Sequence, residues 1–500
     1  VPVWVSCDAG FTQVRKSCIS SSGDIEVEDH SNAVIAAVTP IDNGLCDNGL
    51  LLVSSKGRAY FVEAGVDSDA AGYQSEQIST GCQALLRGQK NVVDGTIYQL
   101  CKIPSEFCGQ SNVFVALTSR ETEEPASSNA DDAPELSDLG VKPTPYLHQF
   151  SVQIVAVSSS NENEEDEDLD GGSVTAVETL FSYNLEKFER GISVGFEYIY
   201  DNEDKKLKPF LCVGTGFLTS DGNDTAGKGK IIAFSFPNSF VEFVKVSEER
   251  NAVIVGAENH SVEKGHTVCG SGVPRDTTVL DVSGNLIKLS NEISSAGNAR
   301  LTFRKSGTAV HQFTLAHFIQ FPAGVTTLGG VCTKEVPPEV SRGGGTLLAT
   351  AGRQMSMMEI RGGRLMKIGF FDLKVTVSSM NIIKNFIACS DIYNSVQFFR
   401  WNVAASEVEL LAYDPYPACV VASTFIVAKD SLQILIADAN GSIFVLQYDP
   451  HSTSGTYRTL RSVAEFHSGS RITALTTYPV NQAPRLRHVE SNVYGSIYGT

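Results

Sequence analysis

Short hairpins that recur at a nearly constant interval restrict the fold of this chain more than any other feature. The apolar runs 434–438 and 443–446 flank Asn440-Gly441, and Asn-Gly between apolar runs signals a hairpin because both turn residues need a positive φ. Hairpins of this form begin near residues 346, 386, 433 and 488, in steps of 40, 47 and 55 residues. Propeller blades repeat at about 40–45 residues, so the sequence predicts an all-β fold, a WD40-like β-propeller of seven blades.

Earlier hairpins are predicted at wider spacing. The run 50–55 pairs with 58–62, the run 113–118 with 150–155, and the run 211–215 with 230–234. Sustained helical periodicity is nearly absent. A β-sandwich is the alternative fold for such a pattern, but the repeat favours the propeller.

Three segments interrupt the repeat. Residues 119–145 are acidic and rich in Ser, Ala and Pro, and residues 158–172 are acidic; both are predicted to be inserted, solvated loops. Residues 247–307 are rich in Gly, Thr and Val, and are predicted to form one small inserted β unit.

The net charge of −18 is concentrated in the two acidic loops. Seven Asp and Glu residues lie in 121–138 and seven more in 161–170; without these 14 carboxylates the net charge would be −4. The remainder therefore lacks the general basic character of a nucleic-acid-binding surface. No apolar run approaches the roughly 20 residues of a membrane helix, so no membrane contact is expected.

The 11 cysteines are an odd number, and no pair has CxxC spacing. In a chain of this length, the pattern is typical of buried free thiols in a reducing compartment.

No catalytic or cofactor motif is complete. Gly214-Thr215-Gly216 follows a strand but lacks a third glycine and a helix at dinucleotide-binding spacing. Gly227-Lys228-Gly229-Lys230 lacks the Lys-Ser/Thr pair of a phosphate loop, and a hairpin turn is the favoured interpretation. We predict no catalytic and no cofactor-binding residues, no cofactor, and no small-molecule substrate.

Possible metal ligands and base-stacking residues also have simpler interpretations. His260, His266 and Cys269 lie close together, but His311 and Cys332 are distant, so a solvated loop is favoured over zinc and no metal ligand is predicted. His467 is interpreted as a polar residue that is hydrogen-bonded within the sheet and connects blades. Several strand aromatics could stack on bases, but packing between blades is favoured; they are Phe398, Phe399, Trp401, Phe444 and Tyr448. Nucleic-acid-binding residues are not identified by the sequence.

Several segments resemble one protein family in their order and spacing. Residues 210–215 followed by 227–234 resemble its "strand-Val-Gly-Thr … Arg-Gly-Arg-Ile-strand" core, residues 183–189 its apolar-Glu-aromatic-Glu element, and residues 460–469 its "Phe-His-apolar-Gly" segment. The family comprises the largest subunit of the cleavage and polyadenylation specificity factor (CPSF), the large damaged-DNA-binding protein and a large splicing-factor subunit. The run 380–448 is most similar to the CPSF branch. Ser468, where the family has an apolar residue, and the insertion 247–307 depart from its pattern.

The resemblance implies a nuclear scaffold in the pre-mRNA cleavage and polyadenylation machinery, with other subunits of a 3′-end processing complex as partners. RNA would be contacted directly or through those partners, and the chain would not be an enzyme. A damaged-DNA-binding or ubiquitin-ligase adaptor, or a splicing-factor scaffold, is the alternative within the family. A propeller enzyme or a sugar-binding propeller is the alternative from another class, and would place carboxylates, His or metal ligands around the central channel.

The family architecture also implies a division of the chain. Residues 1–75 are expected to be the closing blades of a preceding propeller and residues 76–500 the C-terminal propeller, with the family's helical C-terminal domain absent.

Overall fold

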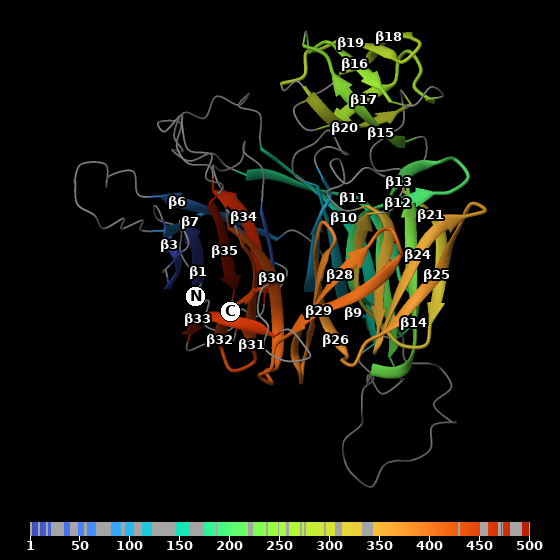
Figure 1. The fold of residues 1–500 in the computed structure, drawn as a ribbon. Coiled ribbons are helices and arrows are strands. Elements are labelled where there is room, and N and C mark those ends of the chain that lie inside the picture. Colours follow the sequence, from blue (N-terminus) through green and yellow to red (C-terminus); the bar gives the residue numbers. More distant parts are fainter. Residues whose placement is uncertain are drawn as a thin grey trace, which may run out of the picture.

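A computed structural model describes most of the chain. The described residues are 3–8, 11–16, 19–21, 35–40, 49–54, 58–66, 82–91, 96–104, 113–122, 147–159, 174–186, 188–218, 224–236, 239–248, 250–256, 260–270, 273–274, 277–294, 297–305, 313–332, 344–428, 431–450, 459–468, 472, 474–480 and 493–499. They are all-β and are organised in several sheets, as the hairpin pattern predicts (Figure 1). Among them, no helix has the length and apolar character needed to cross a bilayer.

Three sheets contain the first part of the chain. One is ordered β2-β1-β35-β34, and its strands are Phe11–Lys16, Val3–Asp8, Val493–Gly499 and Ala474–Val480. The second is ordered β3-β7-β6-β5-β4, and its strands are Ile19–Ser21, Cys82–Asn91, Arg58–Val66, Gly49–Ser54 and Ile35–Pro40. The third is ordered β11-β10-β9-β8, and its strands are Val174–Asn184, Leu147–Ser159, Val113–Thr122 and Thr96–Lys102.

A large sheet in the middle of the chain contains two four-stranded antiparallel groups. The first joins β12, β13, β14 and β21, which are Glu189–Asp201, Lys206–Leu218, Asp224–Ser235 and Thr314–Phe321. The second joins β22, β23, β24 and β25, which are Val325–Cys332, Gly345–Ala351, Gln354–Arg361 and Arg364–Asp372. Single parallel pairings, Ile199 with Gly345 and Asp201 with Ile360, connect the two groups.

Two further four-stranded antiparallel sheets follow along the chain. The first runs in the order β26 to β29, and its strands are Val377–Ile383, Phe386–Asp391, Ser395–Asn402 and Glu407–Tyr413. The second runs in the order β30 to β33, and its strands are Val420–Ala428, Ser431–Asp438, Ser442–Tyr448 and Leu460–His467.

One strand of each sheet or group contacts the corresponding strand of its neighbours. We call these the inner strands: β4, β8, β12, β22, β26, β30 and β34. Each contacts the next in this order, and β34 contacts β4, so the series of contacts returns to its start.

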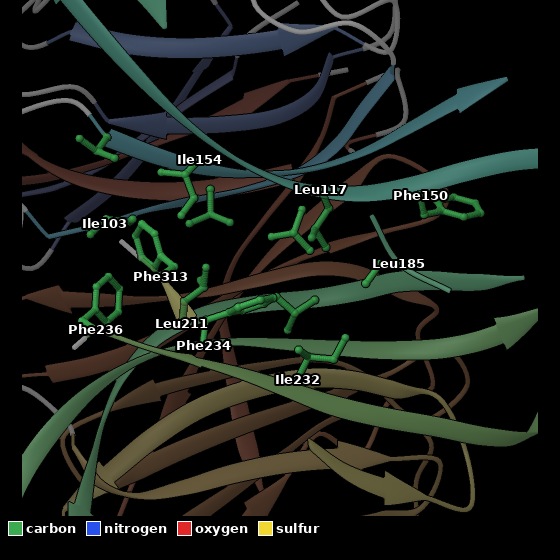
Figure 2. Close-up of a cluster of buried hydrophobic side chains, with 14 residues drawn as sticks. Ile103, Leu117, Phe150, Ile154, Leu185, Leu211, Ile232, Phe234, Phe236 and Phe313 are labelled. Carbon is green, nitrogen blue, oxygen red and sulfur yellow. The ribbon is translucent and has the colours of Figure 1, made fainter. Parts of the chain in front are cut away.

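The apolar core lies between successive sheets. Val152 and Ile154 of β10 pack with Leu211 and Phe234 of β13 and β14 in one buried cluster (Figure 2). Further clusters join the β22–β25 group to the β26–β29 sheet, through Leu348 and Phe399 among others, and the β26–β29 sheet to the β30–β33 sheet. Alternate residues of each strand therefore face opposite neighbours, as expected for sheets that are buried on both faces.

The predicted hairpins are confirmed where the structure describes them. The strand pairs β23–β24, β27–β28 and β31–β32 form at the predicted positions, as do β5–β6, β9–β10 and β13–β14. The last predicted hairpin begins at residue 488, and its first strand lies outside the described residues. Most of the acidic loops 119–145 and 158–172 also lies outside them, although β9 and β10 extend into the two segments.

The expected boundary at residue 75 does not separate the sheets. Strand β1 pairs antiparallel with β35, with Trp4 opposite Ile497, so strands from the two ends of the described chain share one sheet. Figure 1 accordingly shows the two ends of the chain near each other. The inner strand β4 contacts both β8 and β34. No local sequence signal predicts this pairing, because the two segments are distant in the chain.

The inserted β unit consists of strands β15 to β20 and lies at the top of Figure 1, where the pairing of Leu207 on β13 with Val241 on β15 joins it to the large sheet. Its strands are Ser239–Val246, Ala252–Val255, Thr267–Gly270, Val279–Ser283, Leu286–Leu289 and Gly297–Arg304. It has a buried cluster of its own, which includes Val253, Ile287 and Phe303. The unit begins at Ser239 rather than at residue 247, because β15 pairs along its whole length with β20.

Five free cysteines are described. Cys212, Cys269 and Cys389 are buried as predicted, and burial raises the pKa of the Cys212 and Cys389 thiols. Cys419 is exposed, so the expectation of buried thiols is wrong for this residue. It lies in the loop between β29 and β30, where the apolar alternation of the strands does not apply.

Candidate functional site

The family-like motifs, which are distant in sequence, meet in one polar cluster that is buried except for Glu186. We call Glu186, Glu189, Thr215 and Lys230 the motif cluster. Lys230 Nζ lies 2.8 Å from Glu186 Oε1 and 2.9 Å from Glu189 Oε2, and Thr215 Oγ1 donates to Glu189 Oε1 at 2.7 Å. The backbone N–H of Glu186 also donates to Glu189 Oε2, at 3.1 Å. The cluster therefore ties the β11–β12 connection to β13 and β14.

The ammonium of Lys230 lies between two carboxylates, the buried one of Glu189 and the exposed one of Glu186. Burial alone would lower the pKa of Lys230, but hydrogen bonds from its ammonium to the carboxylates of Glu186 and Glu189 outweigh burial and raise it. All contacts of the buried Glu189 carboxylate run to groups of the fold itself. This arrangement is that of a structural clamp.

The two glycine-containing motifs lie within strands. Gly214 and Gly216 belong to β13, and Gly227 and Gly229 belong to β14, so the hairpin-turn interpretation of 227–230 is wrong. A Cβ on Gly229 would meet the carbonyl oxygen of Ala323 and would lie 2.6 Å from that of Thr215. The glycine is required because the backbone that follows β21 passes directly against β14.

The three possible zinc ligands each contact a different group of the fold. His260 Nε2 lies 2.8 Å from the Gly284 carbonyl oxygen, His266 Nδ1 accepts the Glu263 N–H at 3.2 Å, and Cys269 Sγ lies 3.4 Å from a nitrogen of Arg304. Burial lowers the pKa of His266. In the part of the chain that the structure describes, no three His, Cys, Asp or Glu side chains are grouped as metal ligands. His311 and the Cys332 side chain lie outside that part.

His467 and Ser468 both bind at the β31–β32 hairpin. His467 Nδ1 lies 3.1 Å from Ser442 Oγ, and the two residues are cross-strand neighbours, which confirms a hydrogen bond within the sheet. The Oγ and the backbone N–H of Ser468 each donate to the Gly441 carbonyl oxygen at 2.8 Å. Ser468, which departs from the family pattern, therefore stabilises the turn between β31 and β32.

The strand aromatics pack between sheets, as the favoured interpretation predicts. Phe398, Phe399 and Trp401 are buried, and Phe444 and Tyr448 are half-buried. Phe398 packs against Phe425 of the next sheet, with ring centroids 6.2 Å apart. Phe398, Phe399 and Trp401 are therefore not available to stack on bases.

Hydroxyl and amide groups connect two of the inner strands. Ser423 Oγ of β30 lies 2.7 Å from Ser379 Oγ and 2.7 Å from Asn381 Nδ2, both on β26, and accepts from Ser390 Oγ at 2.9 Å. Strands β26 and β30 contain no acidic or basic residues and no His. These two strands therefore present no carboxylate, His or metal-ligand cluster of the kind that a propeller enzyme would use.

Two exposed tyrosines were not singled out by the sequence reasoning. Tyr393 lies in the β27–β28 hairpin and Tyr416 in the β29–β30 loop. Each is 72% exposed, the highest value among the exposed large hydrophobic side chains described. The Pro-Tyr-Pro run 415–417 is the signal that could have drawn attention to this loop.

Comparison with known proteins covers the C-terminal third most directly. Residues 331–500 match the family model described as the CPSF A subunit region. The chain is 28% identical over 156 residues to a probable cleavage and polyadenylation specificity factor subunit 1 of Oryza sativa subsp. japonica, covering 31% of this chain and 11% of the rice protein. It is 32% identical over 130 residues to subunit 1 of Arabidopsis thaliana, covering 26% and 9% of the two chains.

A more distant relative matches a longer stretch. Protein CFT1 of Debaryomyces hansenii is 23% identical over 242 residues, which are 46% of this chain and 18% of the yeast protein. The matched segments thus span about a tenth to a fifth of the length of these relatives. The family match over residues 331–500 begins in β22 and continues through β35. By this match and these relatives, the C-terminal third of the chain is similar to the CPSF A subunit region, and parts of the chain are similar to the CPSF large subunit.

Proposed function

We propose that this chain is part of a nuclear scaffold subunit of the machinery that cleaves and polyadenylates pre-mRNA. The match of residues 331–500 to the CPSF A subunit region carries the proposal, and the relatives from rice, Arabidopsis and yeast support it. The scaffold holds other subunits of a 3′-end processing complex, and RNA is contacted within that assembly. The scaffold itself performs no catalytic step and takes no small-molecule substrate.

The polar residues described above support this non-catalytic role. The motif cluster, the Ser423 contacts and the Ser468 turn each make hydrogen bonds or ion pairs to other groups of the fold. A catalytic acid, base or nucleophile needs a partner group and access to substrate. These residues instead fix the sheets relative to one another, and rigid sheets present loops in constant positions for partners.

Affinity purification of the parent protein from nuclear extract tests this function. Other subunits of a 3′-end processing complex are expected to co-purify in stoichiometric amounts. Recovery with a ubiquitin ligase or a splicing particle in their place would contradict the proposal and favour the adaptor or the splicing-factor scaffold. An untagged extract carried through the same purification is the control.

The fold that supports this role is, we propose, one closed seven-bladed β-propeller. Seven inner strands contact one another in a series that returns to its start, and each belongs to a group of four antiparallel strands, to which β3 adds a fifth, parallel strand in the sheet of β4. The pairing of β1 with β35 would close the ring, because the first and last strands then share a blade. In this arrangement, residues 1–75 supply strands to the same ring as residues 76–500.

Removal of residues 1–16 tests the closed ring. The deletion takes away β1 and β2 and leaves β35 with an unpaired edge. Thermal unfolding should lose its single cooperative transition or move to a much lower midpoint. An unchanged midpoint and unchanged cooperativity would show that the ring closes without these strands, as the division at residue 75 predicts.

A further inference from the structure

Two loops that carry exposed tyrosines are joined into one surface. The backbone N–H of Ser395 donates to the Ala418 carbonyl oxygen at 3.1 Å, and that of Asp414 donates to the Val396 carbonyl oxygen at 2.9 Å. Ser395 Oγ also donates to Asp414 Oδ2 at 2.5 Å. These bonds hold the β27–β28 hairpin and the β29–β30 loop together. We give the name tyrosine face to five exposed residues of the two loops: Ile392, Tyr393, Pro415, Tyr416 and Pro417.

Carboxylates lie beneath the tyrosine face. Asp391 is the last residue of β27, and Asp414 is the first residue after β29. Asp438 is the last residue of β31, and the N–H of Ala439, in the turn that follows, donates to the Cys419 carbonyl oxygen at 2.9 Å. All three side chains are buried. The loop segments 391–395, 413–419 and 438–442 contain no Lys or Arg. The local electrostatic potential is therefore negative.

One of these carboxylates has an unused acceptor. Asp391 Oδ2 accepts from the backbone N–H and the side-chain amide of Asn394, at 3.2 and 2.7 Å. Asp391 Oδ1 is buried and has no hydrogen-bond partner among the described residues. A buried, unsatisfied carboxylate oxygen is rare in folded proteins, and its charge adds to the attraction of this surface for cations.

We propose that the tyrosine face binds an extended, arginine- or lysine-containing segment of a partner protein. Guanidinium and ammonium groups stack on exposed aromatic rings, and the carboxylates beneath attract the same groups. The two flanking prolines keep the loop that presents Tyr416 stiff. Nucleic acid is the poorer match, because its phosphates would be repelled by these carboxylates.

The proposal deepens the proposed scaffold function by giving the chemistry of one partner. Its test does not depend on the identity of the complex, so the two fail separately. If purification of the parent protein yields a different assembly while the peptide result stands, only the proposed function is lost. If the peptide result fails while the complex is recovered, only the tyrosine face is lost.

Fluorescence anisotropy with the full chain tests the tyrosine face. The probe is a short labelled peptide of alternating Arg and Gly, compared with a peptide of alternating Glu and Gly and with a single-stranded oligouridine. The wild-type chain should bind the Arg peptide and not the Glu peptide. The double variant Tyr393→Ala/Tyr416→Ala should bind it about tenfold more weakly.

The variants are chosen to separate this surface from general attraction to an acidic protein. The double alanine variant leaves the net charge unchanged, so weaker binding reports the rings themselves. Tyr393→Phe/Tyr416→Phe should retain binding because the rings remain. Phe318→Ala, which removes a ring that is 63% exposed on β21, is the matched control and should bind as the wild type does.

Three outcomes would overturn the proposal. They are equal affinity of the double alanine variant and the wild type for the Arg peptide, an equal loss in Phe318→Ala, and oligouridine binding that the same two tyrosines control. Circular dichroism of each variant confirms that the fold is intact before binding is compared.

Discussion

The ammonium of Lys230 lies 2.9 Å from a carboxylate oxygen of Glu189, and the Glu189 side chain is fully buried between β12 and its neighbours. Removal of Glu189 leaves Lys230 with only the exposed Glu186 as an anionic partner, and takes the carboxylate acceptor from the Thr215 hydroxyl. Glu189→Ala is therefore expected to lower the free energy of unfolding by about 3–5 kcal/mol, measured by chemical denaturation.

The second carboxylate partner of Lys230 provides the control for this prediction. The side chain of Glu186 is 68% exposed, so Glu186→Ala should cost less than about 1 kcal/mol. Equal losses in the two variants would show that the buried pair has no special role.

The same ammonium predicts how stability changes in alkaline solution. The pKa of Lys230 is raised in the folded chain, so its contribution is fully present below the pKa of an unfolded lysine, about 10.4, and is lost as the pH rises through the folded value. The midpoint of thermal unfolding should therefore fall above about pH 10.4, and Lys230→Met should remove part of this dependence. A Lys230→Met variant with the full alkaline dependence of the wild type would contradict the assignment.

Gly229 predicts a steric effect. Gly229→Ala places a methyl group against the carbonyl oxygens of Thr215 and Ala323, both of which belong to the backbone. We expect a loss of about 1–3 kcal/mol in unfolding free energy. Gly256→Ala is the matched control, because a Cβ there meets nothing within 4 Å; similar losses at both sites would exclude the steric cause.

The hydroxyl of Ser423 predicts a loss at the contact between β26 and β30. Ser423→Ala leaves Ser379, Asn381 and Ser390 without a shared partner, which should cost about 1–3 kcal/mol. Ser462→Ala on the exposed side of β33 should change stability by less than about 0.5 kcal/mol. Denaturant titration of both variants in parallel measures the difference, and a neutral Ser423→Ala would mean that water replaces the hydroxyl at no cost.

Deletion of the inserted β unit should leave the remaining sheets intact. The unit has its own core, and the flanking Phe236 and Phe313 pack with ring centroids 4.4 Å apart, so a short linker bridges the gap. Replacement of residues 239–305 by Gly and Ser should leave the melting midpoint near that of the parent. Deletion of 247–307 instead leaves β15 without its partners β16 and β20. The exposed edges of β15 should make this variant aggregate more readily. A large fall in the midpoint of the first variant would show that the unit supports the sheets.

Local patterns predicted the hairpins, because alternation and turn residues act within a few positions. The packing of Phe398 and Trp401 between sheets followed from the same alternation. The pairing of β1 with β35 did not, since nothing near Trp4 identifies Ile497 as its neighbour. The sequence indicates the Glu189–Lys230 contact only in part. The motifs that contain the two residues can be identified, but their contact depends on the register of β13 with β12 and β14. The sequence does not predict the tyrosine face, because the packing of neighbouring loops determines the exposure of Tyr393 and Tyr416.

The contact between Phe236 and Phe313 has an evolutionary consequence. Because the chain leaves and re-enters its sheet at nearly one point, a foreign module with closely spaced ends can be acquired or lost there in a single genetic event. The host sheets could therefore be inherited unchanged while the module at this position differs. The same position is suitable for the insertion of a fluorescent protein or an affinity tag.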